Sequence, residues 1–260
     1  MKAIFDRNRL RLHRDRVAPL LHNHDFLLKF SSEDIIDRLD SLSIKTDSIL
    51  ELGSRTGLLT SRLIIKYPES RILATDISAN MLALNPAKDK CILDEEEMQL
   101  EGGAFDIIAS VLNMHWINDM RGFLSKISNG LTDDGIFIAS LFGGSSLLVL
   151  RQALLLSEIN AGSGHSPHIS PSASSDDIYR LLQLAGFKFI VTDIQKIELE
   201  YDTAIACMQE IQNMGESSNL VDGVRPLSKA ILKNLENGEF MDRVEIITLI
   251  ASRGNVHIHP

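Results

Sequence analysis

Acidic residues and glycines stand where a short apolar segment of the chain gives way to a helical pattern. Glu51 lies inside the apolar run of residues 49–52, and Gly53 and Gly57 follow it. Asp76 ends the next apolar run, about 20 positions later. Glycines at such a turn let the backbone approach a ligand closely, and the later acid can accept both ribose hydroxyls of an adenosine. The pattern predicts an adenosine-containing cofactor, and both NAD and S-adenosylmethionine meet it.

The charge at this turn favours S-adenosylmethionine over NAD. NAD places a pyrophosphate on a G-x-G-x-x-G turn, whereas the spacing here is Gly53-x-x-x-Gly57, with Glu51 as a like charge nearby. S-adenosylmethionine has no phosphate, and its ammonium and sulfonium groups attract a carboxylate. An NAD-dependent dehydrogenase remains the less favoured enzyme, and a strand-to-helix turn without any ligand remains the structural alternative.

Further polar side chains follow the next two apolar runs. Asp94 comes after residues 91–93, where its carboxylate can accept the adenine amino group, while the adjoining Glu95–Glu97 run is expected to be solvated surface. Asn113, His115 and Trp116 follow the next run, and ligands bind at the carboxyl ends of strands in open α/β sheets. We expect Asn113 and Trp116 to contact the cofactor, with Trp116 beside the sulfonium, and His115 to be the candidate catalytic base.

The elements that must position these residues alternate between strand and helix. Continuous apolar strands between helical patterns are typical of an α/β, doubly wound, mostly parallel sheet. We expect residues 1–45 to form an N-terminal helical extension and residues 46–260 the main domain, with a helical insertion at about 200–240. The expected strands are residues 49–52, 71–76, 91–93, 105–110, 135–141, 187–199 and 245–251, and the first helices are expected at 7–21 and from 33.

Composition excludes several classes of protein. The 260 residues carry a net charge of −9, which argues against a nucleic-acid partner held through phosphates. Two cysteines indicate a reducing compartment, for which the bacterial cytoplasm is the default. No run is apolar enough for an integral membrane segment. No metal is expected, because His257 and His259 lack a third ligand. The arginines of residues 7–16 predict a solvated helix face or a docking surface for an acidic partner, and residues 2–16 could also form a lid over the cofactor site.

Several motifs together resemble one known family. The segment Glu51-Leu-Gly-Ser-Arg-Thr-Gly57, with Asp76 and Asp94, resembles the class I S-adenosylmethionine-dependent methyltransferases. Leu112-Asn-Met-His-Trp-Ile-Asn-Asp119 and Met214-Gly-Glu-Ser217 are similar to the branch that contains NADH dehydrogenase (complex I) assembly factor 5 and the malonyl-acyl-carrier-protein O-methyltransferase of biotin synthesis. The resemblance covers nearly the whole chain. It implies a seven-stranded, Rossmann-like sheet and a protein or carrier-bound substrate.

The resemblance also implies cofactor contacts by five residues, which are Glu51, Gly53, Gly57, Asp76 and Asp94. It leaves three functions open: a methyltransferase, which we expect; a complex I assembly factor that hydroxylates a protein arginine; and a non-catalytic assembly chaperone. Arg55 replaces the usual middle glycine of the cofactor loop and favours the third. The assembly-factor alternatives imply a respiratory complex I subunit as partner and the mitochondrial matrix, at the periphery of the inner membrane, as compartment.

Overall fold

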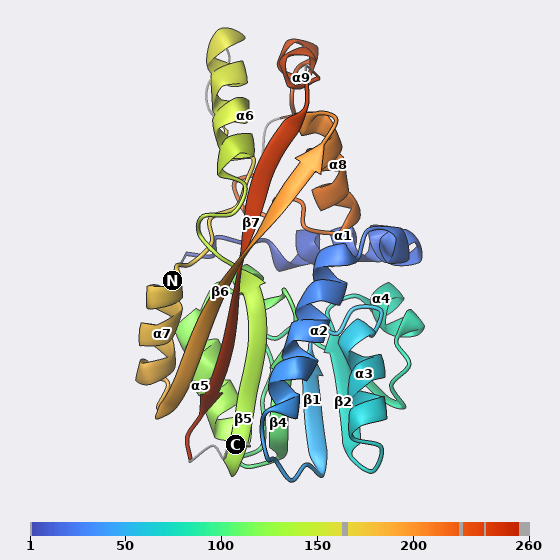
Figure 1. The fold of residues 1–260 in the computed structure, drawn as a ribbon, viewed down its shortest axis with the longest axis vertical. Coiled ribbons are helices and arrows are strands. Elements are labelled where there is room, and N and C mark those ends of the chain that lie inside the picture. Colours follow the sequence, from blue (N-terminus) through green and yellow to red (C-terminus); the bar gives the residue numbers. More distant parts are fainter. Residues whose placement is uncertain (1, 163–165, 224–225, 237, 255–260) are drawn as a thin grey trace.

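The computed structural model describes residues 2–162, 166–223, 226–236 and 238–254. One mixed sheet, flanked by helices, runs through the molecule (Figure 1). In chain order the elements are α1 (Arg7–Val17), η1 (Ala18–Asn23), α2 (Phe26–Asp40), β1 (Ser48–Leu52), α3 (Leu58–Lys66), β2 (Arg71–Asp76), α4 (Ala79–Leu84), β3 (Asp89–Ile92), β4 (Phe105–Ser110), η2 (Met114–Trp116), α5 (Met120–Gly130), β5 (Leu131–Phe142), α6 (Leu148–Asn160), α7 (Ser175–Leu184), β6 (Phe189–Tyr201), α8 (Ala204–Asn213), α9 (Lys229–Leu235) and β7 (Phe240–Ser252).

The sheet has the strand order β3-β2-β1-β4-β5-β7-β6. Strands β1 to β5 pair in parallel, and β7 pairs antiparallel with both β5 and β6. Strand order reverses at β1, because β2 lies on one side of it and β4 on the other. In such open sheets ligands bind beyond the carboxyl ends of the strands at this reversal. The prediction of a doubly wound, mostly parallel, seven-stranded sheet is confirmed.

Alternate side chains of the central strands face two separate cores. Ile49 of β1 and Ile107 of β4 pack with α2 and α3, while Leu50 and Ile108 pack with α5 and α7. Because successive residues of a strand point to opposite faces, a strand covered on both faces is apolar throughout. Because helices pack on both faces of the sheet, β1, β2 and β4 are held in position, and so are the loops at their carboxyl ends. We call these loops, residues 53–57, 76–78, 94–95 and 111–116, the carboxyl edge.

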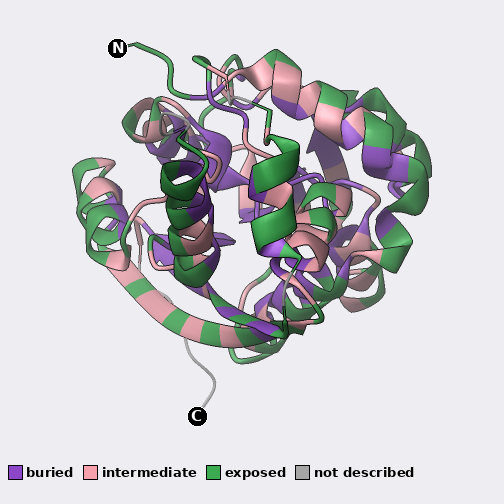
Figure 2. Cartoon of the chain, turned by 90° about the horizontal axis from the view of Figure 1, so that it is seen from above, coloured by how far each residue is buried: buried purple, intermediate pink, exposed green. Residues whose placement is uncertain are grey.

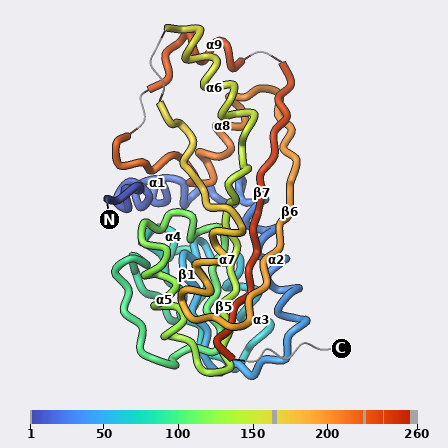
Figure 3. The backbone as a smooth tube through the Cα atoms, turned by 90° about the vertical axis from the view of Figure 1, so that its left-hand side faces the viewer, coloured from blue at the N-terminus to red at the C-terminus, as the bar shows by residue number. Residues whose placement is uncertain are grey.

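Strands β6 and β7 continue beyond the carboxyl edge as a two-stranded ribbon. Residues 240–245 of β7 pair only with β6, since β5 ends at Phe142 opposite Ile246. Helices α6, α8 and α9 lie along this ribbon, above the lower part of the sheet (Figures 1 and 3). Residues of β6 alternate mostly between intermediate and exposed, as expected for the outer strand (Figure 2). The molecule therefore has a wall on one side of the carboxyl edge.

The N-terminal elements differ from the expected ones. A single helix over residues 7–21 was expected, but α1 ends at Val17 and a 3₁₀ helix with Pro19 in its first turn follows. Proline has no backbone N–H to continue an α-helix, which explains the break. Helix α2 begins at Phe26 rather than near residue 33. Among the described residues, no helix is both long and apolar enough to cross a bilayer.

Candidate functional site

The turn after β1 needs both of its glycines. Gly53 and Gly57 have φ of +63° and +89°, in the left-handed region that glycine adopts most readily. A Cβ on Gly53 would lie 2.2 Å from Cγ of Asn113, and one on Gly57 would lie 2.3 Å from Cδ of Pro86. The end of β1 thus approaches Asn113 at the end of β4 with no room for a side chain between them.

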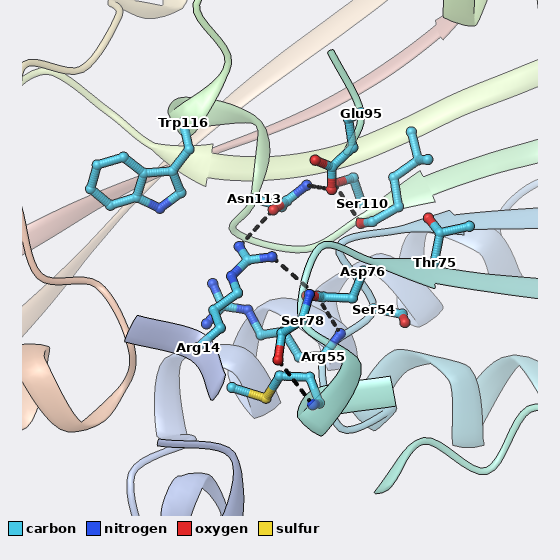
Figure 4. A network of polar contacts seen from close by, with 12 residues as sticks. Arg14, Ser54, Arg55, Thr75, Asp76, Ser78, Glu95, Ser110, Asn113 and Trp116 are labelled. Atoms are coloured by element: carbon cyan, nitrogen blue, oxygen red, sulfur yellow. Dashed lines mark hydrogen bonds and ion pairs between the residues drawn. The ribbon is translucent and has the colours of Figure 1, made fainter. Parts of the chain in front are cut away.

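Asp76 is buried at the end of β2 and accepts three hydrogen bonds. Its donors are the backbone N–H of Arg55 (3.1 Å), the backbone N–H of Ser78 (2.8 Å) and Nη1 of Arg14 (3.1 Å). Ser78 also caps α4 through the N–H of Met81, as the sequence predicts. Figure 4 shows the carboxylate between these donors. Asp76 therefore presents a fixed acceptor at the carboxyl edge, and in this conformation the side-chain donor is Arg14.

Asn113 extends the same network toward the loop after β3. Its amide nitrogen donates to Oε1 of Glu95 (2.9 Å), and its amide oxygen accepts from Nη2 of Arg14 (2.6 Å) (Figure 4). The expectation that Glu95 belongs to a solvated acidic run is wrong, because Glu95 is 0% exposed. Asn113 and Arg7 both donate to its carboxylate, and these contacts compensate for the burial.

Helix α1 supplies the positive charge of the carboxyl edge. Arg7 donates through Nε to Oδ1 of Asp94 (2.9 Å) and also pairs with Glu95, while the fully buried Arg14 pairs with Asp76 (3.1 Å). The expectation of a solvated arginine face is therefore wrong for these two residues. Figures 1 and 3 show α1 lying across the carboxyl edge, below α8. Each acid that the sequence assigns to the ribose and adenine of a cofactor is held by an arginine of α1.

Glu51 is the third acid and has no basic partner among the described residues. It is buried near the end of β1, where Oγ1 of Thr60 donates to it. Burial raises the pKa of Glu51 from its ordinary 4.5 to about 8, because a carboxylate loses its hydration there. The space beside Glu51, Gly53 and Arg55 measures about 10 Å³, which is about the room that one water needs.

The raised pKa of Glu51 makes stability depend on pH. Its contribution is fully present below pH 4.5 and is lost as pH rises through about 8, because the folded state holds a proton that the unfolded chain releases. We expect Glu51→Gln to unfold like the wild type at pH 4, and to be more stable at pH 9 by roughly 5 kcal/mol. Urea unfolding at the two pH values measures this. The exposed Glu69→Gln is the control, and equal pH slopes for Glu51→Gln and wild type would contradict a protonated Glu51.

Arg55 points away from Asp76 and into the segment after α8. Its guanidinium donates to the carbonyl oxygens of Leu112 (2.9 Å) and Met214 (3.0 Å) and pairs with the carboxylate of Glu216. Both side chains of this ion pair are about 95% buried, with 4% and 5% exposed. The arginine that replaces the usual glycine thus ties the cofactor loop to residues 214–216. The sequence shows Glu216 within a recognisable motif, but its partner, 161 positions away, gives no local signal.

His115 and Trp116 meet at the same carboxylate. Nε2 of His115 lies 2.9 Å from Oε2 of Glu216, and Nε1 of Trp116 donates to that oxygen at 2.8 Å. Burial by itself raises the pKa of Glu216, but the Arg55 guanidinium and His115 outweigh it and hold the pKa well below its usual range. Burial lowers the pKa of His115 despite the carboxylate beside it. The ring is therefore neutral at pH 7.

The proton of this neutral ring can be assigned from its partner. An ionised Glu216 only accepts, so Nε2 of His115 carries the proton and Nδ1 carries the lone pair. Nδ1 has no hydrogen-bond partner among the described residues. Trp116 also packs edge-on against Phe5, with ring centroids 5.3 Å apart. Nδ1 of His115 is thus a buried acceptor that no described residue uses.

A cavity of about 410 Å³ lies on the far side of this carboxylate. His115, Trp116 and Glu216 form part of its lining, together with residues of α6, α8 and the β6–β7 ribbon. Its size is that of typical small-molecule sites. His115 and Trp116 of the carboxyl edge also line this cavity, and Glu216, another lining residue, contacts both of them and Arg55.

The residues of the carboxyl edge suit a cationic, hydroxyl-bearing cofactor. Asp76 and Asn113 already accept from a guanidinium, which shows that their oxygens are aimed at donors. Glu51, protonated at neutral pH in this conformation, would ionise beside an incoming cation, because an opposite charge lowers the pKa of a carboxyl group. The chemistry of the donor set fits S-adenosylmethionine. The Arg14 side chain now makes the contacts at Asp76 and Asn113, so such a ligand would have to take them from it.

Comparisons with known proteins agree with this site. A family model described as a methyltransferase domain matches residues 50–137. The chain is 38% identical to the RP459 protein of Rickettsia prowazekii, whose name describes it as a methyltransferase, over 78% of this chain and 92% of that protein. It is 33% identical to the arginine-hydroxylase NDUFAF5 of Danio rerio (83% and 68% covered), and 26% identical to a malonyl-[acyl-carrier protein] O-methyltransferase of Nitrosospira multiformis (81% and 74% covered).

Solved structures share the fold at low identity. A phosphoethanolamine N-methyltransferase 2 of Haemonchus contortus superposes with a TM-score of 0.60 and 13% identity, over 95% of this chain and 60% of that one. A methyltransferase-like protein of Bacillus halodurans superposes with a TM-score of 0.57 and 13% identity, over 86% and 100%. The sheet order and the acidic carboxyl edge thus define a methyltransferase fold. The chain belongs to the class I S-adenosylmethionine-dependent methyltransferase family, in the branch of NDUFAF5 and the malonyl-[acyl-carrier protein] O-methyltransferases.

Proposed function

We propose that this protein is an S-adenosylmethionine-dependent methyltransferase that acts on a protein or carrier-bound substrate. The observation that carries the proposal is that the carboxyl edge and the cavity adjoin at Glu216, which contacts Arg55, His115 and Trp116. On one side lie the acceptors Asp76 and Asn113, and on the other lies the 410 Å³ cavity. Methyl transfer between two bound molecules needs such an arrangement, because most of its acceleration comes from holding donor and acceptor in line.

Different residues of the chain would bind different parts of the cofactor and so orient it. Asp76 would accept the ribose hydroxyls, Asp94 the adenine amino group, and Glu51 would face the ammonium group of the cofactor. Gly53 and Gly57 place no side chain against Asn113 and Pro86. When bound, the cofactor supplies a methyl group on a cationic sulfur. Trp116 would border that methyl group through its π-face.

His115 is our candidate for the base. Glu216 holds its Nε2 at 2.9 Å, and the lone pair of Nδ1 is left to remove a proton from an acceptor in the cavity. A carboxylate acceptor needs no such help, whereas an amine or hydroxyl acceptor does. The pH dependence of turnover with the two kinds of acceptor therefore tests the role of His115.

A second candidate function is hydroxylation of a protein arginine. The identity to arginine-hydroxylase NDUFAF5 (33%) exceeds that to the malonyl-[acyl-carrier protein] O-methyltransferase (26%). A respiratory complex I subunit would then be the partner, and an acyl-carrier protein would be the partner of the methyltransferase. The bacterial cytoplasm and the mitochondrial matrix are the corresponding compartments.

Calorimetric titration with S-adenosylmethionine tests the cofactor assignment. We expect micromolar binding by the wild type and a loss of at least tenfold in Asp76→Asn, which corresponds to ~1.4 kcal/mol, because an amide accepts at only one of its two positions. Asp222→Asn, on the exposed surface, is the matched control. If neither S-adenosylmethionine nor NAD binds, the non-catalytic assembly function takes precedence.

Mass spectrometry then separates the two reactions. The loaded protein is incubated with malonyl-acyl-carrier protein and, separately, with an arginine-containing peptide. A methyltransferase adds the mass of one methylene unit and leaves S-adenosylhomocysteine, whereas a hydroxylase adds the mass of one oxygen atom. Hydroxylation also consumes O2 and two electrons from a reductant, with the second oxygen atom leaving as water, so the peptide incubation is supplied with both. Binding of S-adenosylmethionine without either gain in mass would contradict both candidate substrates.

A further inference from the structure

The 410 Å³ cavity has a lining in which apolar side chains of α6, β6 and α8 form one continuous part. Leu150 and Leu154 of α6 and Leu199 of β6 are each at most 4% exposed, and Ile205 and Met208 of α8 complete the same lining. Ligand sites of this size are typically apolar with a few placed polar groups. The bulk of the ligand must therefore be apolar.

The polar groups of the lining are mostly paired within the protein. Glu216 is neutralised by Arg55, and His168 lies 2.8 Å from Oε1 of Glu158. Arg151 of α6 differs, because its guanidinium donates only to the carbonyl oxygens of Ile169 (3.1 Å) and Ser170 (3.5 Å). Within the described parts of the chain, no carboxylate lies within ion-pair distance of it.

A guanidinium on an apolar wall without a counter-ion favours an anionic ligand. A charge next to a low-dielectric wall is poorly hydrated, and an arriving carboxylate or phosphate restores the lost interaction through charge-assisted hydrogen bonds. Arg151 uses two nitrogens on carbonyl oxygens, and a guanidinium has five N–H donors. Donors therefore remain for an anion.

We propose that the cavity binds an amphipathic anion, namely an aliphatic chain with a carboxylate or phosphate that pairs with Arg151. The inference rests on the proposed function, since it names the substrate class of the compartment that adjoins the carboxyl edge. The chain of the ligand packs along Leu150, Leu154 and Leu199, and its reacting end reaches His115. A free fatty acid, whose carboxylate is the anion, is one source of such a ligand, and an acyl thioester on a carrier protein, whose phosphopantetheine arm carries a phosphate, is another.

Calorimetric titration of the full chain with decanoate, without cofactor, tests the proposal. We expect decanoate to bind at least tenfold more tightly than decyltrimethylammonium, which has the same chain and the opposite charge. Arg151→Gln should remove this preference, and Leu154→Trp should abolish binding of both by filling the cavity. Arg180→Gln, an exposed arginine on α7, should bind decanoate as the wild type does.

Other outcomes overturn the inference. Equal affinity for the two probes excludes recognition of an anion, and unchanged decanoate binding by Leu154→Trp places the binding elsewhere. Melting curves verify that Leu154→Trp is folded, and Leu154→Phe serves as the smaller filling change if it is not. Titration of the same samples with S-adenosylmethionine reports the cofactor site separately, so a failure here is distinct from a failure of the proposed function. Acyl-carrier protein loaded with a decanoyl group distinguishes the carrier-bound source from the free acid.

Discussion

Arg14→Gln is expected to tighten S-adenosylmethionine binding about thirtyfold, which corresponds to ~2 kcal/mol. Arg14 donates to Asp76 at 3.1 Å and to Asn113 at 2.6 Å, and its side chain is fully buried. A cofactor that uses these acceptors must first expel the guanidinium, so the lost contacts offset part of its binding free energy. Glutamine removes the charge, while Asp76 keeps the backbone donors of Arg55 and Ser78.

The measurement is calorimetry on the wild type, Arg14→Gln and Arg11→Gln. Arg11 lies on the same helix but pairs with Asp15 at the surface, so its substitution should leave the affinity unchanged. Arg14→Gln also removes one partner of a buried ion pair, so its unfolding must be followed in parallel. Weaker rather than tighter binding by Arg14→Gln would show that Arg14 contacts the cofactor, and α1 would then be part of the binding site.

Much of the fold could be predicted because the strands are covered on both faces. Residues such as 49–52 and 105–110 read as continuous apolar runs, and the predicted parallel order follows from the helices between them. Strand β7 begins at Phe240, five residues before its expected start, because its first half lies in the ribbon beyond β5. There Asp242 and Arg243 interrupt the apolar run. The covered strands are therefore easier to predict than the ribbon.

The sequence predicted the site residues that lie in the turns after the strands. It predicted far less well which residues on other elements contact them. Asp76, Asn113 and Gly53 are brought together at the carboxyl edge, because they follow strands that are neighbours in the sheet. Whether they bind a cofactor remains a prediction. The partners of these acids come from far along the chain: Arg14 is 62 positions from Asp76, and Arg7 is 87 positions from Asp94.

No local pattern marks a long-range ion pair of this kind. The helical spacing does place Arg14 on the face of Leu10 and Val17, all three of which are buried, but nothing local identifies the acids on other elements that pair with the arginines of α1. The same reason hides the pairing of Arg55 with Glu216, although each residue stands in a motif that the sequence displays. For His257 and His259 no comparison is possible, because both lie outside the described residues.

Glu216→Gln should lower the free energy of unfolding by roughly 3–5 kcal/mol, because it leaves the buried Arg55 guanidinium without its counter-charge. In a domain of this size that loss corresponds to a fall in melting temperature of roughly 10 °C. Glutamine keeps one acceptor oxygen, which cannot serve both Arg55 and His115. Where it turns to Arg55, His115 faces the amide NH2 group, so turnover with an acceptor that needs a base should fall by about a hundredfold. Urea unfolding and initial rates measure the two effects separately.

A double-mutant cycle assigns the loss of stability to the ion pair. Arg55 has φ of +49°, in the left-handed region, so Arg55→Gly removes the charge and also relieves the backbone. In that background Glu216→Gln should cost less than half of what it costs alone, because no uncompensated cation remains. The exposed pair of Glu33 and Arg62 is the matched control, and Glu33→Gln should cost less than about 1 kcal/mol. An equal cost of Glu216→Gln in both backgrounds would show that Glu216 stabilises the protein through His115 and Trp116, and that Arg55 is replaceable in the cofactor loop.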